Sequence, residues 1–247
     1  MILGFAAVAP IGLILLWPHS PLAGVGVLAL SHALLFYPTF RPNVQWLGPV
    51  VTRFATKKPE VWLTIDDGPT EDTRAVLDLF ERHGVRATFF VKGVLAAERP
   101  ELVQEIVARG HSVANHSHTH PSASFWCSLP GRVGMEVDGC NRALADATGA
   151  APRWFRAPVG IKNPAVHPVL KRRGMRLIGW SARGFDSFVS DGDQVLARLL
   201  PDLGPGAILM LHQGREHSLR VLERAIVGVK ERGYTFVIPD DEQLRTA

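Results

Sequence analysis

Hydrophobic and polar positions follow two different patterns along this chain from residue 59 onward. Short apolar runs, rich in β-branched and aromatic residues, alternate with longer amphipathic segments. Runs of the first kind are typical of buried parallel strands, and segments of the second kind are typical of helices. The runs predict strands over residues 61–65, 87–91, 112–115, 153–156, 175–180, 207–211 and 235–238.

Helices are predicted between these strands, and several of them end at a glycine, a residue that readily closes a helix. The predicted helices span residues 73–83, 101–109, 134–148, 164–173, 194–200 and 218–232. Seven strands that alternate with helices favour an α/β fold with a closed or nearly closed barrel, and a doubly wound open sheet is the alternative. Residues 121–131 fit neither element, and we expect a loop there over one face.

The head of the chain has a different character, because the first charged side chain is Arg41. Residues 2–17 and 22–37 are apolar, and the segment between them, with prolines at both ends, predicts a turn. Each apolar stretch is at or just below the length that a helix needs to cross a bilayer. We therefore predict a membrane hairpin or anchor over residues 1–40, a linker over residues 41–58 and a catalytic domain over residues 59–247.

Two alternatives to a membrane anchor exist for this apolar segment. A secretory signal peptide is disfavoured, because no Lys or Arg precedes the apolar run and no clear cleavage site follows it. The other alternative is a buried helical pair packed on the domain. Arg41, Arg53, Lys57 and Lys58 follow the second apolar stretch, and the positive-inside rule then places the catalytic domain in the cytoplasm, anchored in a bacterial inner membrane.

The net charge is +4, and the basic residues are scattered. With no basic stripe interleaved with aromatics, nucleic-acid binding is disfavoured, and attraction to anionic lipid fits the apolar head better. Cys127 and Cys140 have no metal-site spacing, and two free thiols are the simplest interpretation. One bridge between them would be possible in a periplasmic domain. No signal in the sequence indicates an oligomeric state.

Polar residues of unusual kinds follow the ends of the predicted strands. In a parallel α/β barrel all strand carboxyl ends open on one face, where active sites lie. Polar residues far apart in the sequence are therefore expected to lie together on that face. They are Asp66, Asp67, His116, His120, Arg156, Asp186 and His212.

A metal site is one consequence of this placement. His116 and His120 are four residues apart, about one helical turn, so their rings could face the same point. Two imidazoles and one carboxylate with an open position are typical of catalytic zinc. The carboxylate would come from Asp66 or Asp67, whose mutual repulsion a cation would relieve. On spacing alone His118 could replace either histidine, and His212 could be a core histidine instead.

The motifs together resemble the polysaccharide deacetylase family, the group with the NodB homology domain, also described as carbohydrate esterase family 4. The first motif is Thr64-Ile65-Asp66-Asp67-Gly68-Pro69, and the second is Asn115-His116-Ser117-His118-Thr119-His120-Pro121. The third is Arg156-Ala157-Pro158-Val159-Gly160, and the last, altered, is Met210-Leu211-His212. The resemblance covers roughly residues 59–240 and implies the distorted (β/α)7 barrel of that family.

The resemblance also implies roles for individual residues. Asp67, His116 and His120 would hold Zn²⁺ or another divalent metal such as Co²⁺. Such a metal lowers the pKa of bound water, which then becomes a nucleophile. Asp66 would be the catalytic base, and His212 would protonate the leaving amine.

The remaining implied roles belong to groups that support these residues or contact the substrate. Arg156 would pair with Asp66, and Asp186 would orient His212. The backbone N–H of Val159 would hold the oxyanion. Pro158 and Trp180 are expected to contact the substrate.

The fourth motif departs from the family pattern. Trp180 is kept, but Arg183 stands where an Asp is expected, Ser187 replaces a second Trp, and Val159 stands where an aromatic residue is common. The lost aromatics would stack on sugars, so a long polymer is less expected than a small or lipid-linked sugar.

The sequence thus predicts a metal-dependent hydrolase that removes N-acetyl groups from an amino sugar in a membrane-linked or envelope glycan. Two alternatives are an amidase acting on a non-sugar C–N bond and an inactive glycan-binding or scaffold protein. The first would be expected to alter the metal motif, and the second to lose Asp66 or His212, and all of these are present.

Overall fold

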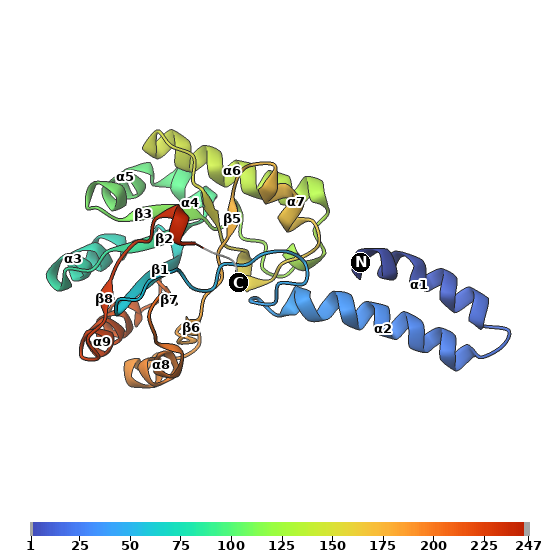
Figure 1. The fold of residues 1–247 in the computed structure, drawn as a ribbon. Helices are drawn as coiled ribbons and strands as arrows, with labels where there is room; N and C mark the ends of the chain where they lie inside the picture. Colours follow the sequence, from blue (N-terminus) through green and yellow to red (C-terminus); the bar gives the residue numbers. More distant parts are fainter. Residues whose placement is uncertain (1, 245–247) are drawn as a thin grey trace.

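The computed structural model describes residues 2–244 and consists of a helical hairpin followed by an α/β domain (Figure 1). The domain is built on one eight-stranded parallel sheet. Its strands are β1 (Glu60–Gly68), β2 (Ala87–Val91), β3 (Ser112–Asn115), β4 (Trp154–Phe155), β5 (Arg176–Leu177), β6 (Ala182–Arg183), β7 (Ala207–His212) and β8 (Thr235–Phe236).

Helices cover the outer face of this sheet (Figure 1). They are α3 (Thr73–His83), α4 (Gly93–Glu98), α5 (Pro100–Ala108), α6 (Pro130–Thr148), α7 (Val166–Lys171), α8 (Gly192–Leu199) and α9 (Ser218–Lys230). Short 3₁₀ turns lie at Phe125–Cys127, Pro158–Gly160, Leu200–Asp202 and Asp241–Gln243. The segment expected to be a loop, residues 121–131, therefore contains a 3₁₀ turn and the first residues of α6, which Pro130 opens.

The sheet is curled into a half-barrel. Its strand order is β5-β4-β3-β2-β1-β7-β6, with β8 paired to the start of β1. The edge strands β5 and β6 are consecutive in the chain, and the five peptide steps from Leu177 to Ala182 span at most about 18 Å. A flat sheet would hold its two edges farther apart, so the sheet must curl.

The predicted linker, residues 41–58, takes part in closing the curl. Val51 forms a parallel bridge with Ile178, and Arg53 forms an antiparallel bridge with Ala207. The segment thus spans from the β5 edge to β7, which corrects the expectation of a plain connection. The predicted strand over 175–180 is also corrected, because only Arg176–Leu177 is a strand and β6 was not predicted.

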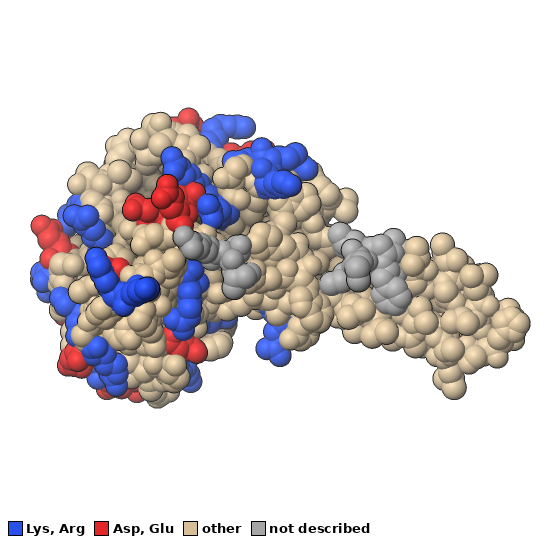
Figure 2. Space-filling model, viewed as in Figure 1, with Lys and Arg blue, Asp and Glu red and all other residues tan. Residues whose placement is uncertain are grey.

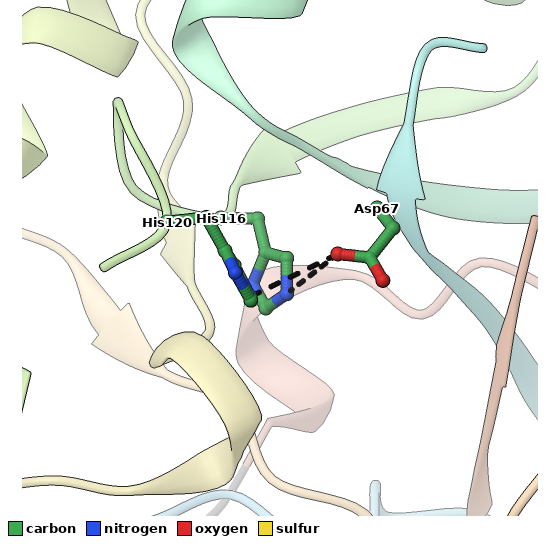
Figure 3. A group of neighbouring side chains, drawn as sticks. All are labelled: Asp67, His116 and His120. Carbon is green, nitrogen blue, oxygen red and sulfur yellow. Dashed lines mark ion pairs between the residues drawn. The ribbon is translucent and has the colours of Figure 1, made fainter. Parts of the chain in front are cut away.

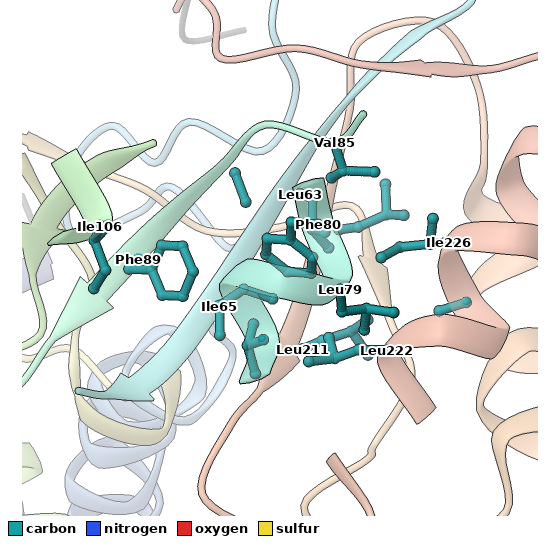
Figure 4. Packing of buried hydrophobic residues seen from close by; sticks show 14 of the residues in the cluster. Leu63, Ile65, Leu79, Phe80, Val85, Phe89, Ile106, Leu211, Leu222 and Ile226 are labelled. Atoms are coloured by element: carbon teal, nitrogen blue, oxygen red, sulfur yellow. The ribbon is translucent and has the colours of Figure 1, made fainter. Parts of the chain in front are cut away.

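The packing of the core shows which face of the sheet each side chain of β1 occupies. Along β1, Leu63 and Ile65 belong to the cluster beneath the outer helices, where they pack with Phe80 and Leu211 (Figure 4). Trp62, which precedes Leu63 and faces the opposite side of the sheet, lies in the separate cluster inside the half-barrel. Because side chains alternate along a strand, Asp66 continues the inward face. The pattern of a strand buried on both sides therefore ends in a carboxylate directed to the interior.

The apolar head forms two antiparallel helices, α1 (Ile2–Leu16) and α2 (Pro21–Phe40), with the turn at the predicted place. They approach closely at Gly24, where a Cβ would lie 3.0 Å from the backbone oxygen of Leu13. The hairpin projects from the domain (Figure 1) and exposes apolar side chains such as Leu22, so the alternative of a helical pair buried on the domain is wrong. By length and composition, α2 is the one described helix able to span a membrane.

The root of the hairpin is anchored on the domain. Lys162 Nζ donates hydrogen bonds to the backbone oxygens of Arg41 and Pro42, at 2.7 and 2.8 Å. These bonds satisfy carbonyls just beyond the end of α2, and the ring of Trp126 packs on Phe36 and Phe40. The hairpin is thus joined to the segment that follows β4. Cys127 and Cys140 are free.

Candidate functional site

The carboxyl ends of the central strands surround one cavity of about 350 Å³. Asp66 and Asp67 at the end of β1, His116 after β3 and His212 at the end of β7 all line it. β1 is hydrogen-bonded to β2 on one side and to β7 on the other, and Asp66 is in register with His212. The sheet alone therefore brings together the first and last motifs, which are far apart in the sequence.

Three side chains in this cavity form a candidate metal site (Figure 3). Asp67 Oδ1 lies 3.9 Å from His116 Nε2 and 3.8 Å from His120 Nε2. The candidate ligand atoms of Asp67, His116 and His120 all lie within 4.8 Å of one another. The Nδ1 atom of His116 lies 3.0 Å from the backbone oxygen of Arg156, a contact that fixes the ring and leaves Nε2 toward the cavity.

The two histidines meet through a tight loop and not along a helix, which corrects the expected geometry. Residues 117–120 are irregular, and both Ser117 and His120 have positive φ, at 65° and 53°. The same loop turns His118 away from the cavity, because its ring packs against Gly93 and Gly139. Of the three histidines that spacing left open, the structure thus selects His116 and His120.

The residues present fit a divalent cation. Asp67 Oδ1 is buried and has no hydrogen-bond donor with good geometry, although Lys92 Nζ lies 2.8 Å away as an ion pair. Tetrahedral ligands at zinc bond lengths lie about 3.4 Å apart, so the observed separations need little adjustment. Burial lowers the pKa of His120 to about 4, and burial also lowers the pKa of His116. Both imidazoles are therefore neutral, as metal ligands must be.

Asp67 itself is an anion in this setting. Burial acts to raise the pKa of its carboxyl, but the interactions with His116 and with the ammonium of Lys92 outweigh burial and hold the pKa well below its usual range. A carboxylate facing two neutral imidazoles is the ligand set that the sequence predicted.

Asp66 has a different partner. Its Oδ1 accepts a hydrogen bond of 2.6 Å from Arg156, a side chain that is almost completely buried. Arg156 also donates to Thr64 Oγ1 at 2.8 Å and stacks on the ring of Phe90. The other oxygen of Asp66 lies 3.8 Å from His116 Nε2, on the side of the candidate metal. The two adjacent acids thus have separate surroundings.

His212 is in contact with Asp186, the partner that the family resemblance implied. Asp186 Oδ1 lies 3.0 Å from His212 Nδ1, and Asp186 Oδ2 accepts a bond of 2.6 Å from the backbone N–H of His212. Burial acts to lower the pKa of His212, but the hydrogen bond to Asp186 and its charge outweigh burial and raise this pKa above its ordinary value. His212 lines the cavity and is therefore not an inert core histidine.

The wall of the cavity includes two of the three predicted substrate contacts. Val159 lines it with its side chain 45% exposed, in a left-handed backbone conformation (φ 49°), and Trp180 lies nearby. Pro158 is buried and is not among the lining residues. Gly160 is required at its position, because a Cβ there would collide with the Trp180 ring.

Sequence reasoning missed several lining residues. Lys92, Ser122, Phe188 and Arg215 all border the cavity. Lys92 immediately follows β2, so the strand-end rule that identified the other groups could have found it. Arg215 lies three residues beyond β7, and Phe188 lies in an irregular segment after β6, where no strand pattern indicates direction.

Comparisons with known proteins agree with this geometry. The polysaccharide deacetylase family model matches residues 54–178. Chitooligosaccharide deacetylase of Bradyrhizobium sp. (strain ANU 289) is 37% identical over 190 residues, which cover 70% of this chain and 86% of that protein.

Two solved structures have the same fold. A family 4 carbohydrate esterase from Streptomyces lividans, solved with acetate, gives a TM-score of 0.69 at 29% identity, over 76% of this chain and 96% of that chain. A CE4 family pseudoenzyme from Bacillus anthracis gives a TM-score of 0.68 at 28% identity, over 75% of this chain and 65% of that chain. The agreement of family model, relatives and fold shows that this chain belongs to the polysaccharide deacetylase family.

Proposed function

We propose that this chain is a metal-dependent deacetylase that hydrolyses the N-acetyl amide of an amino sugar joined to a membrane-linked glycan. The observation that carries the proposal is the convergence of the Asp67, His116 and His120 cluster with Asp66 and His212 on one cavity. An amide needs an activated water, a group to stabilise the oxyanion and an acid for the leaving amine. The cavity contains a candidate for each.

Asp67, His116 and His120 would hold the metal, either Zn²⁺ or another divalent ion such as Co²⁺. When bound, such an ion supplies Lewis acidity, which polarises a carbonyl and lowers the pKa of water. Asp66 takes the proton from the attacking water. Arg156 pairs with Asp66 and fixes its orientation through the 2.6 Å contact.

His212 completes the reaction by donating a proton to the nitrogen as the C–N bond breaks, which releases acetate and a free amine. Asp186 positions the ring and stabilises its cationic form. The backbone N–H of Val159 is the candidate donor to the oxyanion, because the left-handed turn at this residue lies in the wall of the cavity.

The pseudoenzyme among the structural relatives raises the inactive alternative directly. This chain keeps both the candidate base and the candidate acid, and each has its buried partner in place. A binding protein would have no need of these pairs, since buried ion pairs are costly to maintain. Their presence supports hydrolysis.

A lipid-linked substrate is supported by the position of the hairpin. Asn43, just beyond α2, donates a hydrogen bond of 2.7 Å to the backbone oxygen of Trp180, and Pro42 packs beside Gly160. Both Trp180 and Gly160 line the cavity. The root of the hairpin is therefore part of the support of the substrate wall, which would place the cavity close to a membrane surface.

We further propose that the hairpin anchors the chain in a bacterial inner membrane. The visible face of the hairpin has no charged side chain (Figure 2). Aromatic side chains gather at its root, where Tyr37 packs on Trp46, and Phe36 and Phe40 pack on Trp126. Aromatic residues prefer the interface between lipid and water. The basic residues 41, 53, 57 and 58 favour the cytoplasmic side for the domain.

Replacement of the candidate base tests the chemistry. We expect Asp66→Asn to lower kcat for acetate release from N-acetylated chitooligosaccharides about 10²- to 10⁴-fold, because loss of a general base typically costs that much. Asp78→Asn is the matched control and should retain activity, because Asp78 is an exposed residue of α3 that pairs with Arg109. Full activity of Asp66→Asn, with metal content unchanged, would contradict the assigned role.

Metal removal tests the ligand set. Chelation should abolish acetate release, and addition of Zn²⁺ or Co²⁺ should restore it. His116→Ala should lose bound metal, as measured by elemental mass spectrometry, whereas His83→Ala, a change at the protein surface, should keep it. Stoichiometric metal in the His116→Ala variant would show that the ion is held elsewhere.

The pH profile tests the pair of His212 and Asp186. His212 must be protonated to act as an acid, and its raised pKa keeps it protonated to higher pH. Asp186→Asn removes the negative charge and should lower that pKa, so the alkaline limb of kcat/KM should move to lower pH. Asp193→Asn, at an exposed position on α8, should leave the profile in place. An unchanged limb in Asp186→Asn would exclude this coupling.

Fractionation tests the anchor. The full chain should sediment with membranes and resist extraction by high salt or alkaline carbonate. The double substitution Val25→Lys and Leu30→Lys should release it, since each charge at a helix centre costs roughly 2.5–3.5 kcal/mol in a bilayer. Met135→Lys, at an exposed position on α6, is the control. Protease should digest the domain only after spheroplasts are lysed, and digestion in intact spheroplasts would contradict the cytoplasmic side.

A further inference from the structure

The cavity carries more positive charge than the proposed chemistry uses. Three cationic side chains line it, namely Lys92, Arg183 and Arg215, against the two carboxylates of Asp66 and Asp67. A divalent cation on the candidate ligands would add to the positive excess. A neutral sugar gives no reason for such a lining.

The acidic groups near the cavity already have partners. Asp66 binds Arg156, and Asp67 forms an ion pair with Lys92. Both oxygens of Asp186 are engaged by His212. Within residues 2–244, Arg183 therefore has no carboxylate at ion-pair distance, although it lies in the family motif where an acid is expected.

Arg183 is nevertheless held in a defined position. It is the last residue of β6, in register with Met210 of β7. Its guanidinium carbon lies 5.3 Å from the centre of the Trp180 ring and 4.5 Å from that of the Phe185 ring. Its Nε is buried and has no hydrogen-bond partner among the described residues. A half-buried, stacked cation with an unsatisfied donor is suited to an anion that arrives from outside.

We propose that Arg183 binds a phosphate ester carried by the N-acetylated sugar, so that the enzyme prefers a glycosyl phosphate to a neutral sugar. This inference rests on the proposed deacetylase function and names its substrate class. The planar fork of a guanidinium matches two phosphate oxygens. The hairpin favours phosphate over carboxylate, because lipid carriers that hold sugars at membranes are joined to them through phosphate.

Arg215 adds a second positive charge to the cavity. It lies beyond β7, lines the cavity and has no ion pair among the described residues. Because β6 pairs with β7, Arg183 and Arg215 follow neighbouring strands, and a phosphate bound at that end of the strands would be near two cations without ion-pair partners while the acetamido group reaches Asp66 and His212. This arrangement orients the sugar as well as binding it.

A binding experiment separates this inference from catalysis. The full chain in detergent, loaded with Zn²⁺ and carrying Asp66→Asn to prevent turnover, is titrated calorimetrically. The ligands are N-acetylglucosamine, N-acetylglucosamine 1-phosphate and N-acetylmuramic acid, which bears a carboxylate. The 1-phosphate should bind roughly 10- to 100-fold more tightly than the neutral sugar, as expected for hydrogen bonds between charged groups. Arg183→Gln should remove most of this preference, and Arg183→Lys should restore part of it.

The matched control is Arg82→Gln, at an exposed position on α3, which should keep the preference. The inference is overturned if Arg183→Gln retains the preference, if the starting chain shows none, or if only the carboxylate sugar is favoured. Acetate release by the chain without Asp66→Asn is measured in parallel on the same three sugars and on N-acetylated chitooligosaccharides. Absence of acetate from every sugar would count against the deacetylase proposal, whereas the Arg183-dependent preference is decided by the titration alone.

Discussion

The buried ion pair between Asp66 and Arg156 is the interaction on which the site depends. Two adjacent acids at the end of one strand repel each other, and burial makes ionisation of both costly. Arg156 forms an ion pair with Asp66, while Asp67 faces two imidazoles and Lys92. Breaking a buried pair of this kind typically costs about 3–5 kcal/mol, because the remaining charge is left uncompensated. The fold therefore gives the candidate base and the candidate metal ligand separate surroundings.

The curl of the sheet is what brings the remaining groups to this pair. Arg156 follows β4, Asp186 follows β6 and His212 ends β7, and these strands are spread across the sheet order. Curling shortens the distance between its two halves, and the bridges of Val51 and Arg53 connect the β5 edge to β7. The predicted linker thus connects the hairpin to the domain and also pairs with two separate parts of the half-barrel.

The cavity differs from a plain sugar site in ways that point to one class of substrate. Val159 and Ser187 line it at two positions where aromatic residues are common in the family, and Arg183 and Arg215 line it without an ion-pair partner among the described residues. Its wall is supported by residues just beyond the hairpin, through the contacts of Asn43 and Pro42. The proposed substrate, a phosphorylated sugar presented at a membrane, would account for these three features together.

The sequence by itself determined the features that depend on local pattern. Alternation along β1, the acids at its end and the order of the motifs could all be predicted, since strand periodicity and strand ends are local properties, whereas the assignment of individual metal ligands came from the family resemblance. The pairings of Asp66 with Arg156 and of His212 with Asp186 followed from the family resemblance. Only the tertiary structure decided between His118 and its neighbours, because the left-handed residues Ser117 and His120 set the direction of each ring.

The tertiary structure also decided the bridges of residues 51–53, the two-residue strands β5 and β6, and the isolation of Arg183 from any carboxylate. Each of these depends on contacts between residues far apart in the chain. A two-residue edge strand carries no recognisable period, and the partner of a charge is set by which elements meet in space. Pattern along the chain specifies which residues face inward, and the closure of the sheet specifies what they meet there.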